Sequence, residues 1–482
     1  LARELVPILT LPTGTSSAGR PFLRQRSWEA FRDRIPHLFL LGLETLRAVD
    51  RIEAALESSD APAEEVQSIG AACMVARQIV FTAAITAPPN LWLLRHVLSF
   101  FEELGLLSCL ANGDAIYPAE HVVVVGAQER RLVSEELEAD LSFLLSLGIV
   151  EQYDESYRIA GHRRVRRLLE GVRGLAPRPP FDPTPSWRRL FAGEERGADE
   201  QELLLELALP APKRLELEQN HWVPTLEEVE VGYRLVPIVL GMRAAERTED
   251  LAQDLVLRAS AFSPQHPLCA AGALEVLNSA GWVERRGERY RVTALGARGF
   301  ARGPGPFGII HTYHPYMTRG REILLQGRGD VWVRRCENVG ASQDANRRTF
   351  ELANDQLDRF CTDTGFSFSV FIEHAVGRGE ATRQRFERSG EDAIRYFGAD
   401  LEDADLSECE AASAGFGHIK ARGAKFFNAK LEQATFTEAT LVNADFRSAN
   451  LQHVRFIDAD LSRANLVKTD LQHADLHGSR VK

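Results

Sequence analysis

Cysteine is scarce in this chain, and the spacing of the few that occur excludes two common kinds of scaffold. The 482 residues include six cysteines that stand far apart along the sequence, Cys73, Cys109, Cys269, Cys336, Cys361 and Cys409. None belongs to the CxxC pair of a structural zinc site, and no small disulfide framework follows from such a distribution. A reducing cytoplasm is therefore the expected setting.

An excess of positive charge is also missing. Lysine and arginine total 57 against 68 acidic residues, which gives a net charge of −11 at pH 7. This balance provides no global attraction to nucleic acid or to an anionic membrane. The sequence has no uninterrupted apolar run of about 18 residues, the length that crosses a bilayer, and Leu1 opens no signal peptide. We therefore expect neither nucleic acid nor a membrane as a partner.

A strict period of five occupies the C-terminal end of the sequence. Every fifth position from Leu401 to Val481 belongs to a series of seventeen sites, of which fourteen are Leu or Phe. Two residues before each site lies a second series, starting at Ala399, in which twelve of seventeen residues are Ala. A period of five fits neither the 3.6 of a helix nor the 2 of a strand, so the pattern predicts a short-period solenoid.

The repeat from Ala439 to Leu451 reads Ala-Thr-Leu-Val-Asn-Ala-Asp-Phe-Arg-Ser-Ala-Asn-Leu and resembles the pentapeptide-repeat family. The resemblance implies a right-handed quadrilateral β-helix over residues 399–482, with four pentapeptides per coil and about four coils. Leu and Phe would fill the axis, and Ala would leave room at the corners. Both inward series are interrupted early, at Cys409, Ala411, Ile419 and Ala421. We expect the coil that contains these residues to be poorly filled and therefore weak.

Residues from about 27 to 85 predict two helices separated at Pro62. The second, from Ile69 to Ile85, is apolar on nearly every side, so it is expected to be largely buried. Two consecutive prolines, Pro88 and Pro89, are expected to end it.

Three later segments share the order helix, glycine break, strand, polar turn and strand, which is typical of a winged-helix module. They run from Leu94 to Tyr117, with the turn at Asn112-Gly113, from Leu141 to Ile159, and from Leu274 to Val292. Winged helices that read DNA need basic or amide side chains on the exposed face of a helix.

Acidic residues are expected on that face instead, namely Glu102, Glu103, Asp140 and Glu275. A basic cluster also occurs, at Arg163, Arg164, Arg166 and Arg167, and we interpret it as a solvated helix face. The modules are therefore expected to pack or dimerise rather than to bind DNA.

One segment has the pattern of a cofactor turn. Residues 370–386 predict a short strand, a glycine-containing turn and a helix. The turn follows the spacing acid-x-Gly-x-Gly-x-Gly, with Ala in place of the first Gly, at Glu373, Ala375, Gly377 and Gly379. Twenty-one residues beyond Gly379, Asp400 ends a second predicted strand and could hold ribose hydroxyls. Because Gly-x-Gly is common in proteins, the alternative is that this turn is a plain loop that binds nothing. Asp400 could likewise be a solvated corner residue of the repeats, since it is in phase with them.

The stretch from Gly232 to about Asp400 resembles the methyltransferase domains of polyketide-synthase loading modules, as in apratoxin and saxitoxin assembly. The matching runs are Leu235-Val-Pro-Ile-Val-Leu, Ala280-Gly-Trp, Tyr313-His-Pro-Tyr-Met and Asn338-Val-Gly-Ala-Ser. The resemblance implies S-adenosylmethionine as cofactor at the cofactor-turn residues, and an acyl carrier protein as partner. A class I methyltransferase needs about seven strands, however, and only pentapeptides follow Asp400. Methyl transfer is therefore expected to be absent or to depend on a partner chain.

Two histidines, His311 and His314, are three residues apart and could share a helix face as metal ligands, with Glu322 or Glu337 nearby in sequence. The favoured interpretation is that they line or cap a helix beside Pro315, because nothing supplies a firm third ligand.

The predicted fold class is multidomain α+β followed by an all-β repeat. Five parts are expected: a helical region with two winged modules (1–172), a Pro-rich linker with acidic helices (173–231), a methyltransferase-lid-like region (232–335), a partial nucleotide-binding βα unit (336–398) and the solenoid (399–482). The leading functional hypothesis is a degenerate or partner-dependent methyltransferase-like protein of polyketide biosynthesis. The alternative is a non-enzymatic interaction protein, with gyrase protection or DNA binding less favoured. A homodimer could form through the winged modules or the last coil.

Overall fold

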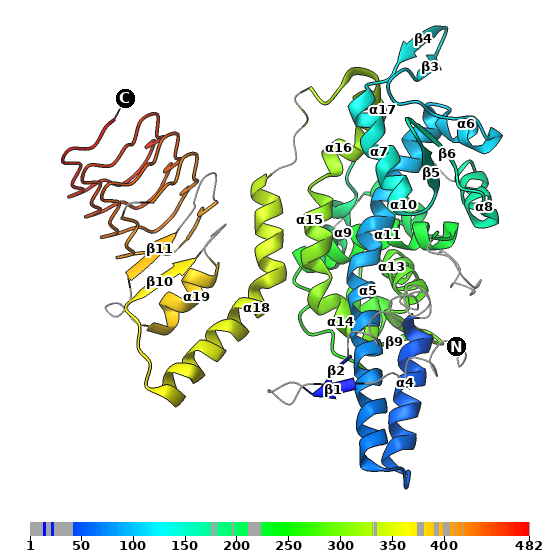
Figure 1. Cartoon of the computed structure of the whole chain (residues 1–482), viewed down its shortest axis with the longest axis horizontal. Helices are drawn as coiled ribbons and strands as arrows, with labels where there is room; N and C mark the ends of the chain where they lie inside the picture. The colour runs from blue at the N-terminus through cyan, green and yellow to red at the C-terminus, as the bar shows by residue number, and fades with distance from the viewer. Residues whose placement is uncertain are drawn as a thin grey trace. The chain divides into compact units, whose positions relative to one another are not determined.

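The computed structural model describes residues 13–15, 21–23, 42–174, 179, 181–194, 197–210, 223–329, 331, 335–373, 380–389, 395–398, 405–409, 411–417 and 419–481. The chain divides into two compact units, Leu1–Val333 and Arg334–Lys482. The first is mostly helical with small antiparallel sheets, and the second contains the pentapeptide repeats (Figure 1). The boundaries predicted near residues 172 and 231 lie inside the first unit.

The first unit is built from helices of very different length. They are α4 (Gly42–Glu57), α5 (Ala63–Glu103), α6 (Leu106–Asn112), α7 (Ser134–Ser146), α8 (Arg163–Val172), α9 (Thr184–Ala192), α10 (Ala198–Ala208), α11 (Leu226–Ala244), α12 (Ala259–Phe262), α13 (Pro267–Ser279), α14 (Ala294–Arg302), α15 (Pro304–His311), α16 (His314–Thr318) and α17 (Gly320–Gln326). Its strands are β1 (Thr13–Thr15), β2 (Pro21–Leu23), β3 (Val122–Val125), β4 (Gln128–Arg131), β5 (Val150–Tyr153), β6 (Ser156–Ile159), β7 (Val256–Leu257), β8 (Val283–Arg286) and β9 (Arg289–Val292).

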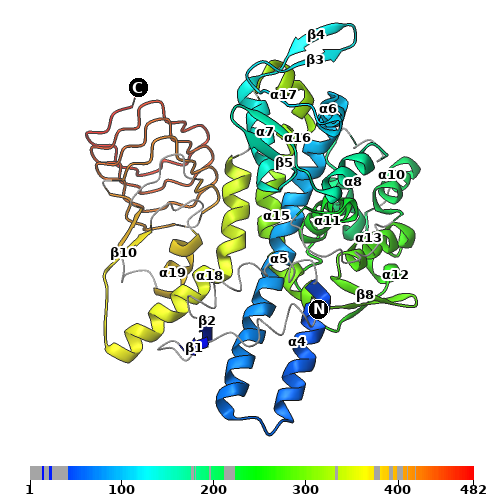
Figure 2. The same cartoon turned by 45° about the vertical axis from the view of Figure 1, so that its right-hand side comes forward.

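Helix α5 runs through the first unit and continues past both prolines that were expected to end it (Figure 2). An interior proline costs roughly 3 kcal/mol, because it removes a hydrogen bond and crowds the preceding turn. The turns beyond Pro89 bury Trp92, Phe100 and Phe101, each worth about 1.5–3 kcal/mol. Helix α11 also packs closely here, since a Cβ at Gly232 would collide with Leu91. Tertiary packing thus outweighs the local penalty, and the predicted end was wrong.

The first half of α5 is less buried than its composition indicates. Helix α4 packs beside it through Val49, Ala72 and Cys73, and the two form a helical hairpin (Figure 2). Only 33% of the most apolar 18-residue window of α5 is buried, and Met74 is 43% exposed. By length and composition α5 is the one helix among the described residues that could cross a bilayer, a test that core helices of water-soluble domains also pass. The expectation of a largely buried helix was wrong. The sequence has no uninterrupted apolar run here, because Arg77 and Gln78 interrupt it, yet α5 is apolar enough on average to pass the test.

Two of the three predicted winged hairpins are confirmed. Strands β5 and β6 pair after α7, and β8 and β9 pair after α13, each as an antiparallel hairpin. The helices stop because Gly148 and Gly281 have φ values of +67° and +74°, which L-residues with a Cβ rarely adopt.

The first predicted hairpin was wrong. The Asn112-Gly113 pair ends helix α6, with Gly113 at φ +85°, instead of forming a β-turn. Ile116 then bridges Tyr157 of β6, and the hairpin forms later, from β3 and β4. An Asn-Gly pair is equally suited to ending a helix and to forming a tight β-turn, so the dipeptide alone could not distinguish the two structures.

The second unit contains α18 (Arg335–Thr364), β10 (Val370–Glu373), α19 (Glu380–Ser389) and β11 (Arg395–Gly398) before its repeats. Strands β10 and β11 are parallel neighbours, with α19 in the connection between them. Helix α19 packs on α18, where Arg388 pairs with both Asp355 and Asp358. This strand-helix-strand order is the one expected from sequence, and in the described part of this unit the sheet has two strands.

The repeats form coils of four pentapeptides, as predicted. Parallel bridges join residues twenty apart, such as Thr435 to Arg455 and Asp445 to Asn465, so each coil pairs with the next through backbone hydrogen bonds. From Ala414 to Leu461 the side chains of both inward series are buried, with Phe436 and Ala439 at 0% and 1% exposure. This arrangement, with a ladder of stacked Phe rings, is typical of a quadrilateral β-helix.

The irregular residues of the early coil remain inside the solenoid. Cys409, Ile419 and Ala421 are buried, with exposures of 8%, 3% and 0%, and Ala411 packs against the same core. The predicted weakness of this coil stays a prediction, because burial alone does not measure how completely the smaller Ala421 fills the space of a Leu or Phe.

Each solenoid corner depends on a left-handed residue. The position two after each residue of the first inward series has φ between +55° and +61° at twelve non-glycine sites. Asn428, Asn443 and Asp458 suit this conformation best, because their short polar side chains tolerate it. The coil-to-coil hydrogen bonds offset the strain at the remaining corners.

Candidate functional site

The predicted cofactor turn is described at one residue. Glu373 is the last residue of β10 and is in register with Gly398 of β11. The other four, Ala375, Gly377, Gly379 and Asp400, lie outside the described residues. Their assignment to S-adenosylmethionine stays a prediction.

The two histidines singled out from sequence lie at the junction of two short helices. His311 ends α15 and His314 begins α16, and their ring centroids are 5.5 Å apart. Nε2 of His311 donates to Oδ1 of Asp182 at 3.0 Å and lies 3.1 Å from Oγ1 of Thr184. Across the described ranges, no group of three or more His, Cys, Asp or Glu is arranged to hold a metal ion. The histidines instead line a pocket.

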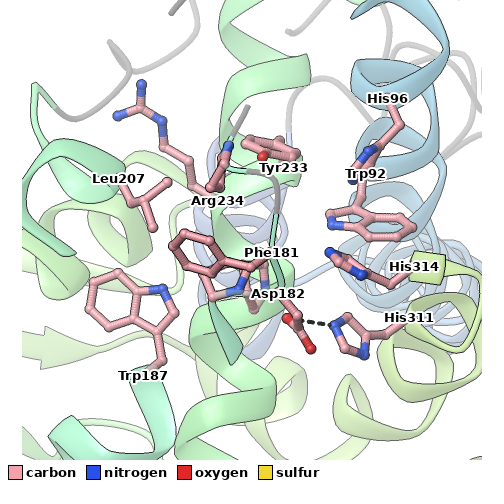
Figure 3. Close-up of a pocket in the computed structure, with 13 residues that line it drawn as sticks. Trp92, His96, Phe181, Asp182, Trp187, Leu207, Tyr233, Arg234, His311 and His314 are labelled. Carbon is pink, nitrogen blue, oxygen red and sulfur yellow. Dashed lines mark hydrogen bonds and ion pairs between the residues drawn. The ribbon is translucent and has the colours of Figure 1, made fainter. Parts of the chain in front are cut away.

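This pocket, which we call the ring pocket, is walled by aromatic and imidazole rings. Its right-hand wall in Figure 3 is a column of four rings, His96, Trp92, His314 and His311. The ring centroids of Trp92 are 4.3 Å from those of His96, 6.1 Å from His314 and 6.0 Å from His311. The remaining lining residues are Pro179, Phe181, Asp182, Pro183, Trp187, Leu207, Tyr233, Arg234 and Pro237. The hollow opens to solvent, and its enclosed part is small, since the centre of a water-sized molecule can occupy only about 20 Å³ of it.

Six helices and one loop bring these residues together. Trp92 and His96 are one turn apart on α5, so they lie on the same face of that helix. Tyr233 comes from α11, Trp187 from α9, and Asp182 from the loop that precedes α9. None of these residues was predicted from the sequence, because they lie up to 141 residues apart from one another in the chain. The Trp92–His96 spacing was the one local signal available.

Asp182 is the fixed negative charge of the ring pocket. Burial raises the pKa of its carboxyl, but the His311 hydrogen bond and the backbone N–H of Thr184 outweigh burial and lower the pKa to about 2. The side chain is 29% exposed. A carboxylate accepts about four hydrogen bonds, so the bonds to His311 and Thr184 leave acceptor capacity.

Positive charge lies at the Tyr233 side of the pocket. The guanidinium of Arg95 is 5.4 Å from the centre of the Tyr233 ring. Glu230 accepts from Arg95 at 2.7 Å and from Arg234 at 3.1 Å, so one buried carboxylate serves two guanidinium groups. Removing any one of the three would leave a buried charge poorly compensated.

The acidic residues that were expected on exposed helix faces differ in how buried they are. Asp140 is 7% exposed, and burial, with help from the charge of Glu136, raises its pKa to about 8. Its exposed placement was therefore wrong. Glu275 accepts hydrogen bonds from Tyr290 and Arg285. In the basic cluster of α8, Arg164 is buried and the other three arginines are exposed.

The outer surface of the solenoid carries one column with apolar character, which we call the Phe427 column. Its members, twenty residues apart on successive coils, are Ser407, Phe427, Arg447 and Val467. Phe427 is 39% exposed and Val467 59% exposed. The Arg447 guanidinium lies 5.6 Å from the Phe427 ring centre and is held by Asp445 at 2.7 Å.

Comparison with known proteins identifies the repeats. The model of the pentapeptide-repeat family, in eight copies, matches residues 424–463 and 444–481. This segment is therefore a pentapeptide-repeat region, and the match does not extend to the rest of the chain. No curated protein is significantly similar to the chain.

Several solved pentapeptide-repeat structures resemble the C-terminal part. HetL of Nostoc sp. strain PCC 7120, a protein involved in heterocyst differentiation regulation, is 24% identical over 24% of this chain and 47% of its own, with a TM-score of 0.18. Rfr23 of Cyanothece 51142 is 20% identical over 24% of this chain and 82% of its own, with a TM-score of 0.19. A thylakoid-lumen protein of Arabidopsis thaliana is 30% identical over 17% of this chain and 63% of its own, with a TM-score of 0.14. The chain spans about half the length of HetL.

Proposed function

We propose that this chain is a non-enzymatic interaction protein whose solenoid binds a partner protein through the Phe427 column. The observation that carries the proposal is the exposure of Phe427 and Val467 on either side of Arg447. Aromatic residues and arginine are enriched at protein-binding hot spots, whereas isolated exposed apolar residues are ordinary. Here three such side chains fall in one column.

The solenoid supports this role because its backbone is rigid. Coils pair through hydrogen bonds on both sides, for example Arg455 N–H to Ala434 and Phe436 N–H to Arg455. Successive coils lie roughly 4.8 Å apart, so the column from Phe427 to Val467 spans about 10 Å. Side chains on such a scaffold lose little backbone entropy on binding.

Mimicry of DNA is a weaker account of the solenoid. Residues 399–482 carry thirteen acidic and ten basic residues, and six of the acids lie between Asp400 and Glu410 at one end of the repeats. A duplex mimic needs a long acidic face, and this composition does not provide one. The proposed partner is therefore a protein, and nucleic acid is not expected.

Methyl transfer, the leading hypothesis from sequence, has no support beyond the resemblance. The family match lies in the pentapeptide repeats, outside the stretch from Gly232 to Asp400 that carries the methyltransferase resemblance. Within the described residues, the parallel pair β10 and β11 is followed directly by repeats. S-adenosylmethionine binding stays a prediction that thermal denaturation tests, because a ligand of the folded state raises its melting temperature. Stabilisation at millimolar cofactor would contradict the non-enzymatic part of the proposal.

The interaction test compares two triple variants of the full chain. One changes the column, with Phe427→Ser, Arg447→Ala and Val467→Ser. The matched control changes the same positions of the repeat on another face, with Thr437→Ala, Ile457→Ser and His477→Ala. Both should unfold at the wild-type temperature, since all six side chains are at least partly exposed.

A true partner is a protein that wild type and control retain in quantitative affinity capture and that the column variant loses. Binding is then measured with purified components, including an acyl carrier protein as a candidate that the resemblance suggests. We expect the column variant to weaken binding by about 30-fold or more, the loss typical of one hot-spot residue. Equal binding by the two variants would contradict the proposal.

A further inference from the structure

The ring pocket of the first unit has the chemistry of a ligand site that is independent of the solenoid. We propose that it binds a planar bicyclic heteroaromatic ring through stacking, with an N–H on the edge of the ring donated to Asp182. Purines and indoles share this chemistry.

The shape of the pocket favours a flat ring. Trp92 and His314 present their rings on one wall, and Phe181 lies across from them (Figure 3). Phe181 is 43% exposed, so its ring can rotate onto a ligand without disrupting the core. Each aromatic contact with the ligand contributes binding free energy beyond that of burial when the two rings are offset-stacked or edge-to-face.

Asp182 defines the polar end of the ligand. It is an acceptor with capacity left after its bonds to His311 and Thr184, and it lines the pocket at 29% side-chain exposure. An anionic acceptor in a partly desolvated site forms strong hydrogen bonds to N–H donors. A ligand with a carboxylate or phosphate at this position would be repelled.

A cationic ligand fits less well, although aromatic walls often bind cations. Arg95 lies over the Tyr233 ring at 5.4 Å, and the pocket lining includes Arg234. A ligand cation stacked on Tyr233 would compete with the Arg95 guanidinium that already lies over that ring. The arrangement therefore favours a neutral ring.

The test uses pairs of ligands that differ in one N–H. Inosine and 1-methylinosine represent the purine class, and indole and 1-methylindole the indole class. Binding to the full chain is measured by isothermal titration calorimetry up to millimolar ligand. We expect at least one N–H ligand to bind about tenfold or more tighter than its methylated partner, because methylation removes the donor and leaves the carboxylate unpaired.

Two variants locate the site. Phe181→Leu should weaken binding about fivefold or more, whereas Phe360→Leu, at a Phe that is 51% exposed in the second unit, should not change it. Asp182→Asn should reduce the preference for the N–H ligand. Thermal denaturation checks that the Asp182→Asn variant is folded. Phe181→Leu tests the same site independently, because Phe181 is exposed and its substitution is not expected to unfold the chain.

Three results would overturn the proposal. They are absence of binding by inosine and by indole, equal binding of each methylated pair, and binding that Phe181→Leu leaves unchanged. Binding by one pair alone supports the proposal and assigns the ligand to that class.

Discussion

Phe426 and Phe446 stack one coil apart in the solenoid, with ring centroids 4.7 Å apart and ring planes 4° from parallel. The separation equals the spacing of neighbouring strands, so the backbone repeat itself dictates ring stacking. Both side chains are fully buried. The adjacent Phe427 points outward and is 39% exposed, which provides a matched pair of phenylalanines in one repeat.

Truncation of a stacked ring should destabilise the solenoid strongly. Phe446→Ala is expected to lower the free energy of unfolding of the repeats by about 3–5 kcal/mol, because it removes burial and leaves a cavity between Phe426 and Phe456. Phe427→Ala should cost about 1 kcal/mol or less. Urea denaturation followed by circular dichroism measures both, and similar losses would contradict the assignment of inward and outward positions.

Asp182 should contribute to stability through its bond to His311. Its pKa is about 2 in the folded state and 3.8 ordinarily, a difference worth about 2 kcal/mol. Because the folded pKa is the lower one, this stability is present above pH 3.8 and is lost as pH falls toward 2. Asp182→Asn should therefore be less stable than wild type at pH 7 and equally stable near pH 2. A constant difference across this range, in paired denaturation curves, would argue against the contribution of the Asp182–His311 hydrogen bond.

Asp140 should have the opposite effect on stability. Its folded pKa of about 8 lies above the ordinary 3.8, so stability is greatest below pH 3.8 and falls as pH rises toward 8. Asp140→Asn should remove this decline and stabilise the first unit at pH 8 by an amount on the order of a few kcal/mol. Asp154→Asn, at an exposed turn, is the control. No gain for Asp140→Asn at pH 8 would mean that the carboxyl is better solvated or better paired than its burial indicates.

Replacing glycine by alanine should change stability in opposite directions at two positions. Gly281→Ala introduces a Cβ at φ +74° with no contact closer than 3.6 Å, so the expected loss of about 1–2 kcal/mol reflects backbone conformation. Gly70 lies inside α5 with open space around it, and Gly70→Ala should stabilise by about 0.5–1 kcal/mol. Calorimetric melting of both variants tests this contrast, which vanishes if Gly281 can adopt a negative φ.

Local sequence patterns predicted much of the fold. The five-residue period placed Phe436 and Ala439 inside, and the resemblance to pentapeptide repeats implied four repeats per coil. The hairpins after Gly148 and Gly281 were also predictable, because each combines a left-handed helix end with two short strands. The Asn112-Gly113 pair was misread, since helix ends and tight turns use the same residues.

The ring pocket was far less predictable. His311 and His314 were noticed as a pair, but their partners Trp92 and Asp182 lie more than a hundred residues earlier. No local sequence period links such distant positions. The two histidines also allowed a metal site as a hypothesis, because an imidazole can ligate a metal as well as line a pocket. The pocket follows from the packing of α5, α9, α10, α11, α15 and α16.

The sequence by itself determined the solenoid, because each repeat carries its own inward and corner residues and contacts only its neighbours. Tertiary structure decided the course of α5 past Pro88 and Pro89, the burial of Asp140 and the assembly of the ring pocket. These features depend on contacts between segments distant in the chain, whose burial energy exceeds the local preferences that a sequence displays.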